Sequence, residues 1–397
     1  MRLRHRDGQT VHLSYCTNVH PAEDLAGIVG QLDAYAVPIR RWLDSDVLGL
    51  GLWLSAPVAT ALAADPAARR RLRAELDGRG LEVVTLNGFP YRSFQAPVVK
   101  HAVYQPDWTT RERLDYTLDL ARVLVDLLPD DAARGSISTL PLAWRDPWDA
   151  DRAAEADRRL AELATGLAEL HRQTGRVIRV GFEPEPGCVV ESTTQAAERL
   201  SKIDIRWLGI CLDLAHLACA WEEPAAALAR LHAAGLPVVK VQVSAALQAL
   251  DPVAAADHLR GYVEPRFLHQ TRAAACADAV EPADPAHAAD DLDAALADGL
   301  PGAWRVHYHV PVHAQPDPPL SSTSPVLRAA LRELFDGPVA GCDHLDVETY
   351  TWGVLPTSRR PRSDVELAAG IAAELAYARA ELGALGLAPA APSEVWS

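Results

Sequence analysis

Four polar residues lie where strand-like apolar runs give way to loops, and together they have the chemistry of a metal site. They are Glu183, Asp213, Gln242 and Glu348. Three carboxylates and an amide brought together would repel one another and lose hydration unless a positive charge lay between them. A divalent cation meets that need. An oxygen-rich ligand set suits Mn²⁺ or Mg²⁺, and a nearby imidazole as fifth ligand would also admit Zn²⁺ or Co²⁺.

Glu183 lies in the stretch GFEPEPG, residues 181–187, directly after a short β-branched run. The prolines and the final glycine end any regular structure there, so a surface turn with solvated acids is the alternative interpretation. Three other strand ends are expected to converge on Glu183. We therefore favour a functional site over a surface turn as the interpretation of this stretch. Glu183 leaves the strand first and is assigned as a metal ligand and acid/base. Glu185 is assigned as a substrate contact.

Strand alternation indicates which side chains point the same way as the expected ligands. Lys240 shares a strand face with Gln242, and His344 and Asp346 share a face with Glu348. Taken singly, Lys240, His344 and Asp346 are best interpreted as salt-bridged groups inside a barrel. Lys240 is also kept as a secondary candidate for a substrate contact.

Short apolar runs alternate with helix-like segments along most of the chain. The eight expected strands cover residues 11–16, 47–54, 81–86, 136–140, 177–180, 208–212, 237–244 and 339–348. Strands separated by helices indicate a parallel α/β arrangement, and eight is the number of strands that closes a TIM barrel. A doubly wound open sheet is the second choice, because no GxGxxG or GxxxxGK[ST] loop follows any of these strands.

We predict an α/β fold in which residues 1–385 form a single (β/α)8 barrel. Residues 245–315, approximately, interrupt this alternation of strands and helices. They are predicted to be an insertion between the seventh and eighth strands. This insertion carries one extra strand within residues 304–313 and could cover the site. Residues 386–397 are rich in Pro and Ala and are expected to be a disordered tail.

The formal charge of −15 disfavours a general nucleic-acid or anionic-membrane partner, since phosphate binding needs a basic surface. No apolar stretch is long enough for a transmembrane helix, and the N-terminus lacks a signal-peptide core. The six cysteines are scattered without CxxC spacing, which is typical of reduced, cytoplasmic thiols. We therefore expect a cytoplasmic protein that acts on a small molecule. Its Ala-rich helices would suit a homodimer.

Several strand-end segments resemble those of a known superfamily. The segments are NGFPY (87–91), VYQPDW (103–108), FEPEPG (182–187), CLDLAH (211–216), KVQVS (240–244), LHQ (268–270), HYHVP (307–311) and VETYTW (347–352). In these segments, which span nearly the whole chain, the sequence resembles the xylose-isomerase-like TIM-barrel superfamily of sugar isomerases, epimerases and endonuclease-IV-type enzymes. More specifically, it resembles the metabolite traffic protein EboE family.

The resemblance implies metal ligation by a Glu, an Asp, a His and a Glu after strands five to eight. Glu183, Asp213 and Glu348 match this pattern, whereas Gln242 stands where the pattern has a histidine. His269 or His309 from the inserted region could supply the missing imidazole, and both are also candidates for substrate contacts. His216 matches a histidine that contacts substrate in sugar epimerases of the superfamily. Asn87 belongs to the first matching segment and is taken as a further substrate contact.

Three functions remain to be separated. The favoured one is a metal-dependent isomerase or epimerase of a sugar or cyclitol-type polyol in secondary metabolism. In it Glu183 and Glu348 relay a proton on opposite sides of the ion, and His216 holds a substrate oxygen. The alternative is a non-catalytic, accessory role in metabolite trafficking, which the name of the Ebo family implies. Endonuclease-IV-like cleavage is disfavoured by the acidic charge and by the small number of histidine ligands.

Overall fold

Eight parallel strands close into a barrel in the computed structural model, which describes residues 1–274 and 286–390. In barrel order they are β2 (Thr10–Cys16), β3 (Leu48–Trp53), β4 (Leu81–Asn87), β5 (Gly135–Thr139), β6 (Ile178–Phe182), β7 (Leu208–Asp213), β8 (Val238–Val243) and β14 (His344–Val347). The barrel closes where β14 pairs in parallel with β2, with Asp346 opposite Ser14. The predicted TIM barrel is confirmed. Its eighth strand is shorter than residues 339–348, because the strand begins only at His344.

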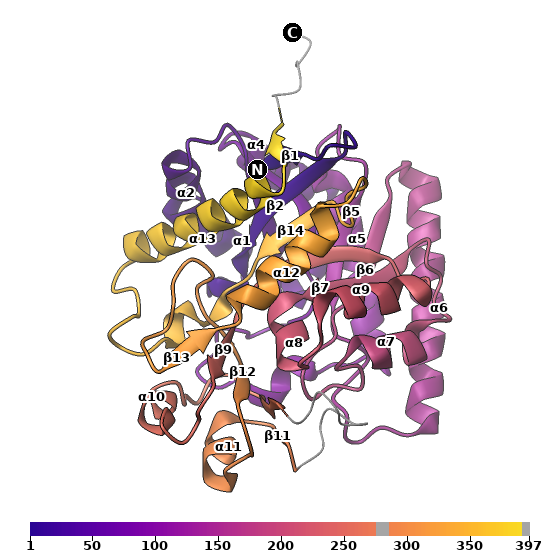
Figure 1. Cartoon of the computed structure of the whole chain (residues 1–397). Coiled ribbons are helices and arrows are strands. Elements are labelled where there is room, and N and C mark those ends of the chain that lie inside the picture. The colour runs from indigo at the N-terminus through magenta and orange to yellow at the C-terminus, as the bar shows by residue number, and fades with distance from the viewer. Residues whose placement is uncertain (275–285, 391–397) are drawn as a thin grey trace.

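Helices alternate with the barrel strands, as Figure 1 shows. They are α1 (Leu25–Gln31), α2 (Val37–Trp42), α3 (Ala56–Ala64), α4 (Pro66–Asp77), α5 (Arg111–Leu127), α6 (Ala150–Thr174), α7 (Thr193–Leu200), α8 (Leu214–Cys219), α9 (Pro224–Ala233), α12 (Ser324–Phe335) and α13 (Asp364–Ala384). Side chains cap their first turns: Thr110 accepts from the backbone N–H of Arg113, and Asp149 from that of Arg152. The barrel strands are almost wholly buried, as expected of a parallel sheet covered by helices.

The insertion between β8 and β14 forms a sheet of its own. Its strands are β9 (Ala246–Ala249), β10 (Thr271–Ala273), β11 (Ala288–Ala289), β12 (Trp304–His309) and β13 (Leu320–Ser322), paired in the order β11-β10-β12-β9-β13. Two short helices, α10 (Ala256–Arg260) and α11 (Leu292–Asp298), accompany it. In Figure 1 these elements gather at the lower end of the barrel. The sequence correctly predicted an insertion between these two barrel strands. It predicted one extra strand and an end near residue 315, whereas the described residues of the insertion form five strands, the last of which ends at Ser322.

The two described ends of the chain meet at the opposite end of the barrel (Figure 1). A short strand β1 (Arg2–Arg4) pairs with β2 and also with β15 (Ala388–Pro389). The tail expected to be disordered is therefore ordered in part, because residues 388–389 pair with β1. Residues 391–397 lie outside the described residues. Nowhere in residues 1–274 and 286–390 is there a helix long and apolar enough to cross a membrane.

Candidate active site

The four expected metal ligands come together at the carboxyl ends of the late strands. Glu183 follows β6, Asp213 ends β7, Gln242 lies near the end of β8, and Glu348 follows β14. All four are buried, with exposed fractions of 5% or less. Asp213 lies opposite Gln242 in the β7–β8 ladder. A potential ligand atom of Asp213 lies within 4.8 Å of one on Glu183, and likewise of one on Glu348. The two glutamates therefore flank Asp213.

Several buried polar atoms in this cluster have no hydrogen-bond partner. They are Glu183 Oε2, Asp213 Oδ2, both amide atoms of Gln242, and Nε2 of His309. Leaving buried acceptors unpaired costs roughly 1–3 kcal/mol each and more for charged groups. A divalent cation among them would satisfy the carboxylate oxygens together with the amide oxygen. The residues present therefore fit a metal ion.

The loop after β6 is shaped so that both of its acids face inward. Gly187 has φ +90°, and a Cβ at this position would collide with the ring of Trp144. The Gly187 N–H donates to Glu191 Oε2 at 2.7 Å. Glu191 is in turn paired with Arg272 of β10, whose Nη2 lies 2.9 Å from the same oxygen. The inserted sheet thus fixes the loop that carries Glu183 and Glu185.

Two asparagines orient Glu348. The Nδ2 of Asn87 and that of Asn18 donate to Glu348 Oε1 at 2.8 Å and 2.7 Å. Asn87 was predicted to contact substrate, and its amide instead holds a carboxylate while it lines the cavity. Asn18 was not predicted, although it follows the first strand just as Asn87 ends the third. That position after a strand was the signal that could have revealed it.

His216 lies beside the carboxylates in the first turn of α8. Its Nδ1–H donates to the Pro184 carbonyl at 2.8 Å, and its Nε2 lies 3.2 Å from Glu185 Oε2 and 3.7 Å from Asp213 Oδ1. Burial opposes a charge on His216, but the carboxylates of Asp213 and Glu185 outweigh it and raise the pKa. The His216 side chain lines the cavity, and its Nε2 faces the Glu185 and Asp213 carboxylates. Its contact with substrate stays a prediction.

Burial and mutual repulsion raise the pKa values of the acids. Burial raises the pKa of Glu348 to about 8, and the nearby Asp213 carboxylate adds to the effect. For Glu183, burial and then the Glu348 and Asp213 carboxylates raise the pKa well above its usual range. Burial raises the pKa of Glu185 to about 7, partly offset by His216 and by the Tyr104 hydroxyl that donates to it at 3.0 Å. Clustered acids with such pKa values are typical of functional sites.

The inserted sheet brings two histidines to the cluster and keeps a third away. His309 Nε2 lies 3.9 Å from Asp213 Oδ2, and His307 lines the cavity. The predicted candidate His269 does not line the cavity, because its ring nitrogens are bound to the Glu264 carboxylate at 2.8 Å and the His307 carbonyl at 3.0 Å. Its assignment as a substrate contact is not supported.

Lys240 does not line the cavity either. Its Nζ lies 2.9 Å from Asp346 Oδ2, and both side chains are fully buried in the barrel. Asp346 also accepts from the Ser14 hydroxyl at 2.7 Å. The salt-bridged interpretation of Lys240 and Asp346 therefore describes their contacts, and a direct substrate contact by Lys240 has no support.

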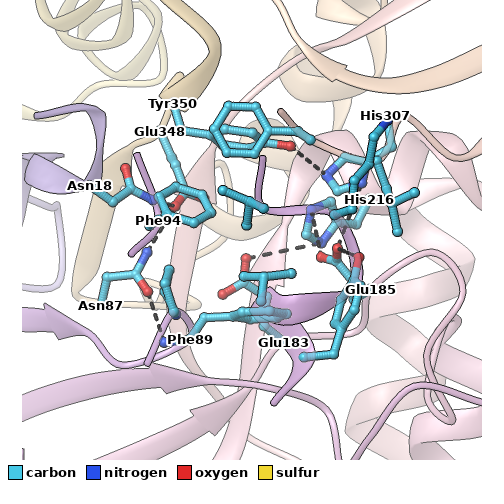
Figure 2. A pocket seen from close by; sticks show the side chains of 17 residues that line it. Asn18, Asn87, Phe89, Phe94, Glu183, Glu185, His216, His307, Glu348 and Tyr350 are labelled. Carbon is cyan, nitrogen blue, oxygen red and sulfur yellow. Dashed lines mark hydrogen bonds and ion pairs between the residues drawn. The ribbon is translucent and has the colours of Figure 1, made fainter. Parts of the chain in front are cut away.

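Apolar and aromatic side chains line the cavity together with the acids, and Phe89, Phe94 and Tyr350 are among them (Figure 2). The rings of Phe94, Phe267 and Tyr350 pack together, with centroids 4.8–5.4 Å apart. Among the described residues that line it, Lys100 is the single Lys or Arg, and its ammonium is paired with Asp291. The cavity thus offers carboxylates and imidazoles together with mainly apolar walls.

A closed eight-stranded barrel with polar residues at the carboxyl ends of its strands places the protein among TIM-barrel proteins. A family model described as xylose isomerase-like TIM barrel matches residues 47–265, more than half of the chain. The chain belongs to this xylose isomerase-like TIM-barrel family. No curated protein matches the chain by sequence.

Solved structures with the same fold cover nearly the whole chain. A protein from Anabaena variabilis assigned as a sugar phosphate isomerase/epimerase has 14% identity and a TM-score of 0.53, covering 95% of this chain and 99% of its own. An L-ribulose 3-epimerase has 12% identity and a TM-score of 0.52, with 94% and 95% coverage. A xylose isomerase-like protein from Mycobacterium smegmatis in complex with magnesium has 14% identity and a TM-score of 0.51, with 94% and 98% coverage. At such identities the likeness shows the fold.

Proposed function

We propose that the protein is a metal-dependent isomerase or epimerase of a sugar or cyclitol-type polyol. The observation that carries this proposal is the set of unpartnered buried acceptors on Glu183, Asp213 and Gln242. They occupy the strand ends where the barrel's chemistry is expected. Glu183, Asp213, Gln242 and Glu348 would hold the ion. When bound, the ion would polarise a substrate carbonyl or hydroxyl and lower the pKa of the adjacent C–H or O–H.

The chain's own residues supply the proton steps. Glu183 and Glu348 flank Asp213 and lie on different sides of the cavity in Figure 2. One glutamate would take a proton from the carbon next to the substrate carbonyl, and the other would return a proton to a carbon. His216 would donate to a substrate oxygen.

The walls of the cavity favour an uncharged substrate with an apolar face. A phosphoryl group needs free positive charge or a helix N-terminus, whereas the ammonium of the cavity's Lys100 is already paired with Asp291. The cluster of Phe94, Phe267 and Tyr350 would instead pack on the C–H face of a ring. We therefore propose a non-phosphorylated polyol as substrate.

A hydrogen-exchange assay tests the catalytic role. The Mn²⁺-loaded protein would be incubated in D₂O with an uncharged ketohexose such as fructose, or with a keto-inositol, and followed by NMR. We expect deuterium at the carbon next to the carbonyl, with no exchange for Glu183→Gln or Glu348→Gln. Glu333→Gln, an exposed change on α12, is the matched control. Equal exchange in the two glutamine variants and the wild type would refute the proposed relay.

A second candidate is an accessory, non-catalytic role in metabolite trafficking, in line with the resemblance to the EboE family. The cavity walls, which are mainly apolar and aromatic side chains, favour it, since such a cavity could hold a molecule without turning it over. If this role is right, Glu183→Gln and Glu348→Gln should both preserve the function of the protein in its cell. Loss of that function with retained folding would argue for catalysis.

A further inference from the structure

The imidazole of His309 comes from the inserted sheet but reaches the acids of the barrel. His309 ends β12 and is fully buried. Its Nδ1 lies 2.8 Å from the carbonyl oxygen of Glu348. Because a carbonyl oxygen only accepts, Nδ1 must carry the proton, and the neutral ring then has its lone pair on Nε2. A ring N–H bound to a backbone carbonyl is the usual arrangement of a metal-ligating histidine.

The lone pair of His309 faces another unpaired acceptor. Nε2 has no hydrogen-bond partner and lies 3.9 Å from Asp213 Oδ2, which has none either. Two buried acceptors without a donor between them are unfavourable. Metal–nitrogen and metal–oxygen bonds of about 2.0–2.2 Å together span up to roughly 4.3 Å. A cation between the two atoms therefore fits the observed gap and satisfies both.

We infer that His309 is a ligand of the proposed cation, so that the inserted sheet supplies the nitrogen donor of a centre otherwise built from oxygen. This inference rests on the proposed function, because it concerns the same site. A nitrogen donor favours Zn²⁺, Co²⁺ or Mn²⁺ over Mg²⁺. It also makes ion binding depend on the position of the insertion, since His309 and Glu348 are joined by their hydrogen bond.

The neighbouring His307 provides a matched control. It lies two residues away on the same strand and is also buried. Its Nδ1 donates to Gln270 Oε1 at 2.8 Å, and its Nε2 lies 3.5 Å from the Tyr350 hydroxyl. Both of its nitrogens have partners. Substituting His307 should therefore also disturb the buried part of β12, but it leaves the unpaired Nε2 of His309 in place.

The experiment measures Mn²⁺ binding and its ligand nitrogen in the full chain. Metal-free wild type, His309→Ala and His307→Ala would be titrated with Mn²⁺. Pulsed EPR would then detect coupling of the ion to an imidazole ¹⁴N. We expect this coupling in the wild type and in His307→Ala, and its loss in His309→Ala with at least about tenfold weaker binding. His309→Gln, with a polar side chain of similar length, replaces the alanine variant if that variant does not fold.

A rescue variant tests the position of the ion. Gln242 lies opposite Asp213 in the neighbouring strand, and its amide atoms are also unpartnered. Adding Gln242→His to His309→Ala should restore the nitrogen coupling and most of the affinity.

The possible failures can be distinguished. Absence of nitrogen coupling in the wild type, or unchanged coupling and affinity in His309→Ala, would overturn the role of His309. If Glu183→Gln still abolished Mn²⁺ binding in that case, the proposed carboxylate centre would stand. If Glu183→Gln also bound Mn²⁺ like the wild type, the proposed metal site itself would be wrong.

Discussion

Replacing Glu348 by Gln should stabilise the metal-free protein while it destroys the metal site. The Glu348 carboxyl is buried beside Asp213, and its pKa is raised to about 8 from an ordinary 4.5. Glutamine keeps the shape of the side chain, and its Oε1 can accept the same bonds from Asn18 and Asn87. Without an ion, the variant needs no proton uptake on folding at neutral pH, whereas the wild-type carboxyl does. With an ion, it lacks a ligand.

The size of the effect follows from the pKa shift. Because the folded-state pKa lies above that of the unfolded chain, the folded protein binds a proton more tightly. Stability is therefore fully present below the unfolded value of 4.5 and is lost as the pH rises toward 8. At pH 7 the loss is about 2.5 pKa units at ~1.4 kcal/mol each, or roughly 3–4 kcal/mol. At pH 5 the loss is below ~1 kcal/mol.

The assay is urea unfolding in the presence of a chelator, at pH 5 and at pH 7, of the wild type, Glu348→Gln and the surface control Glu333→Gln. The comparison between variants matters because buried histidines also titrate. Burial lowers the pKa of His20 to about 3, for example. We expect the free energy of unfolding of Glu348→Gln to exceed that of the wild type by roughly 3–4 kcal/mol at pH 7 and by much less at pH 5. A variant that is less stable than the wild type at both pH values would refute the reasoning.

Three further predictions concern the same region. Because the pKa of Glu348 in the metal-free site is raised to about 8, Mn²⁺ binding near neutral pH should release protons. Its calorimetric heat should therefore vary with the ionisation enthalpy of the buffer, and its affinity should rise with pH. A heat independent of the buffer would contradict this. Lys240→Met should lower the free energy of urea unfolding by about 3–5 kcal/mol, because it leaves Asp346 buried without its partner. Adding Asp346→Leu should recover most of this loss, and a double variant no more stable than Lys240→Met would contradict the prediction. Tyr104→Phe removes a bond that lowers the pKa of Glu185, so that pKa should rise further when followed by carboxyl NMR, whereas no change would contradict the contact.

Much of the barrel could be predicted because parallel strands covered on both faces are nearly continuous apolar runs. The clustering of the acids could also be predicted, because a barrel brings the carboxyl ends of its strands to one face. The xylose isomerase-like family and the α/β barrel are confirmed. The EboE relationship, the cytoplasmic location and the homodimer stay predictions.

The insertion was harder to predict because local patterns determine little of it. Its strands are two to six residues long and several are rich in alanine, which has low strand propensity, so only the run at 304–313 was recognisable. His269 and His309 looked equivalent as residue types. Their roles differ because the His269 ring is bound to Glu264, whereas His309 faces Asp213. Such tertiary contacts leave no periodic signal in the sequence.

The most direct test of the metal centre is anomalous diffraction from crystals of the Mn²⁺-soaked protein, collected on both sides of the manganese edge. We expect one strong anomalous peak between the side chains of Glu183, Asp213 and Glu348, with Gln242 and His309 beside it. The same crystals of Glu183→Gln should lose the peak. A wild-type map without anomalous density among these side chains would contradict the central claim.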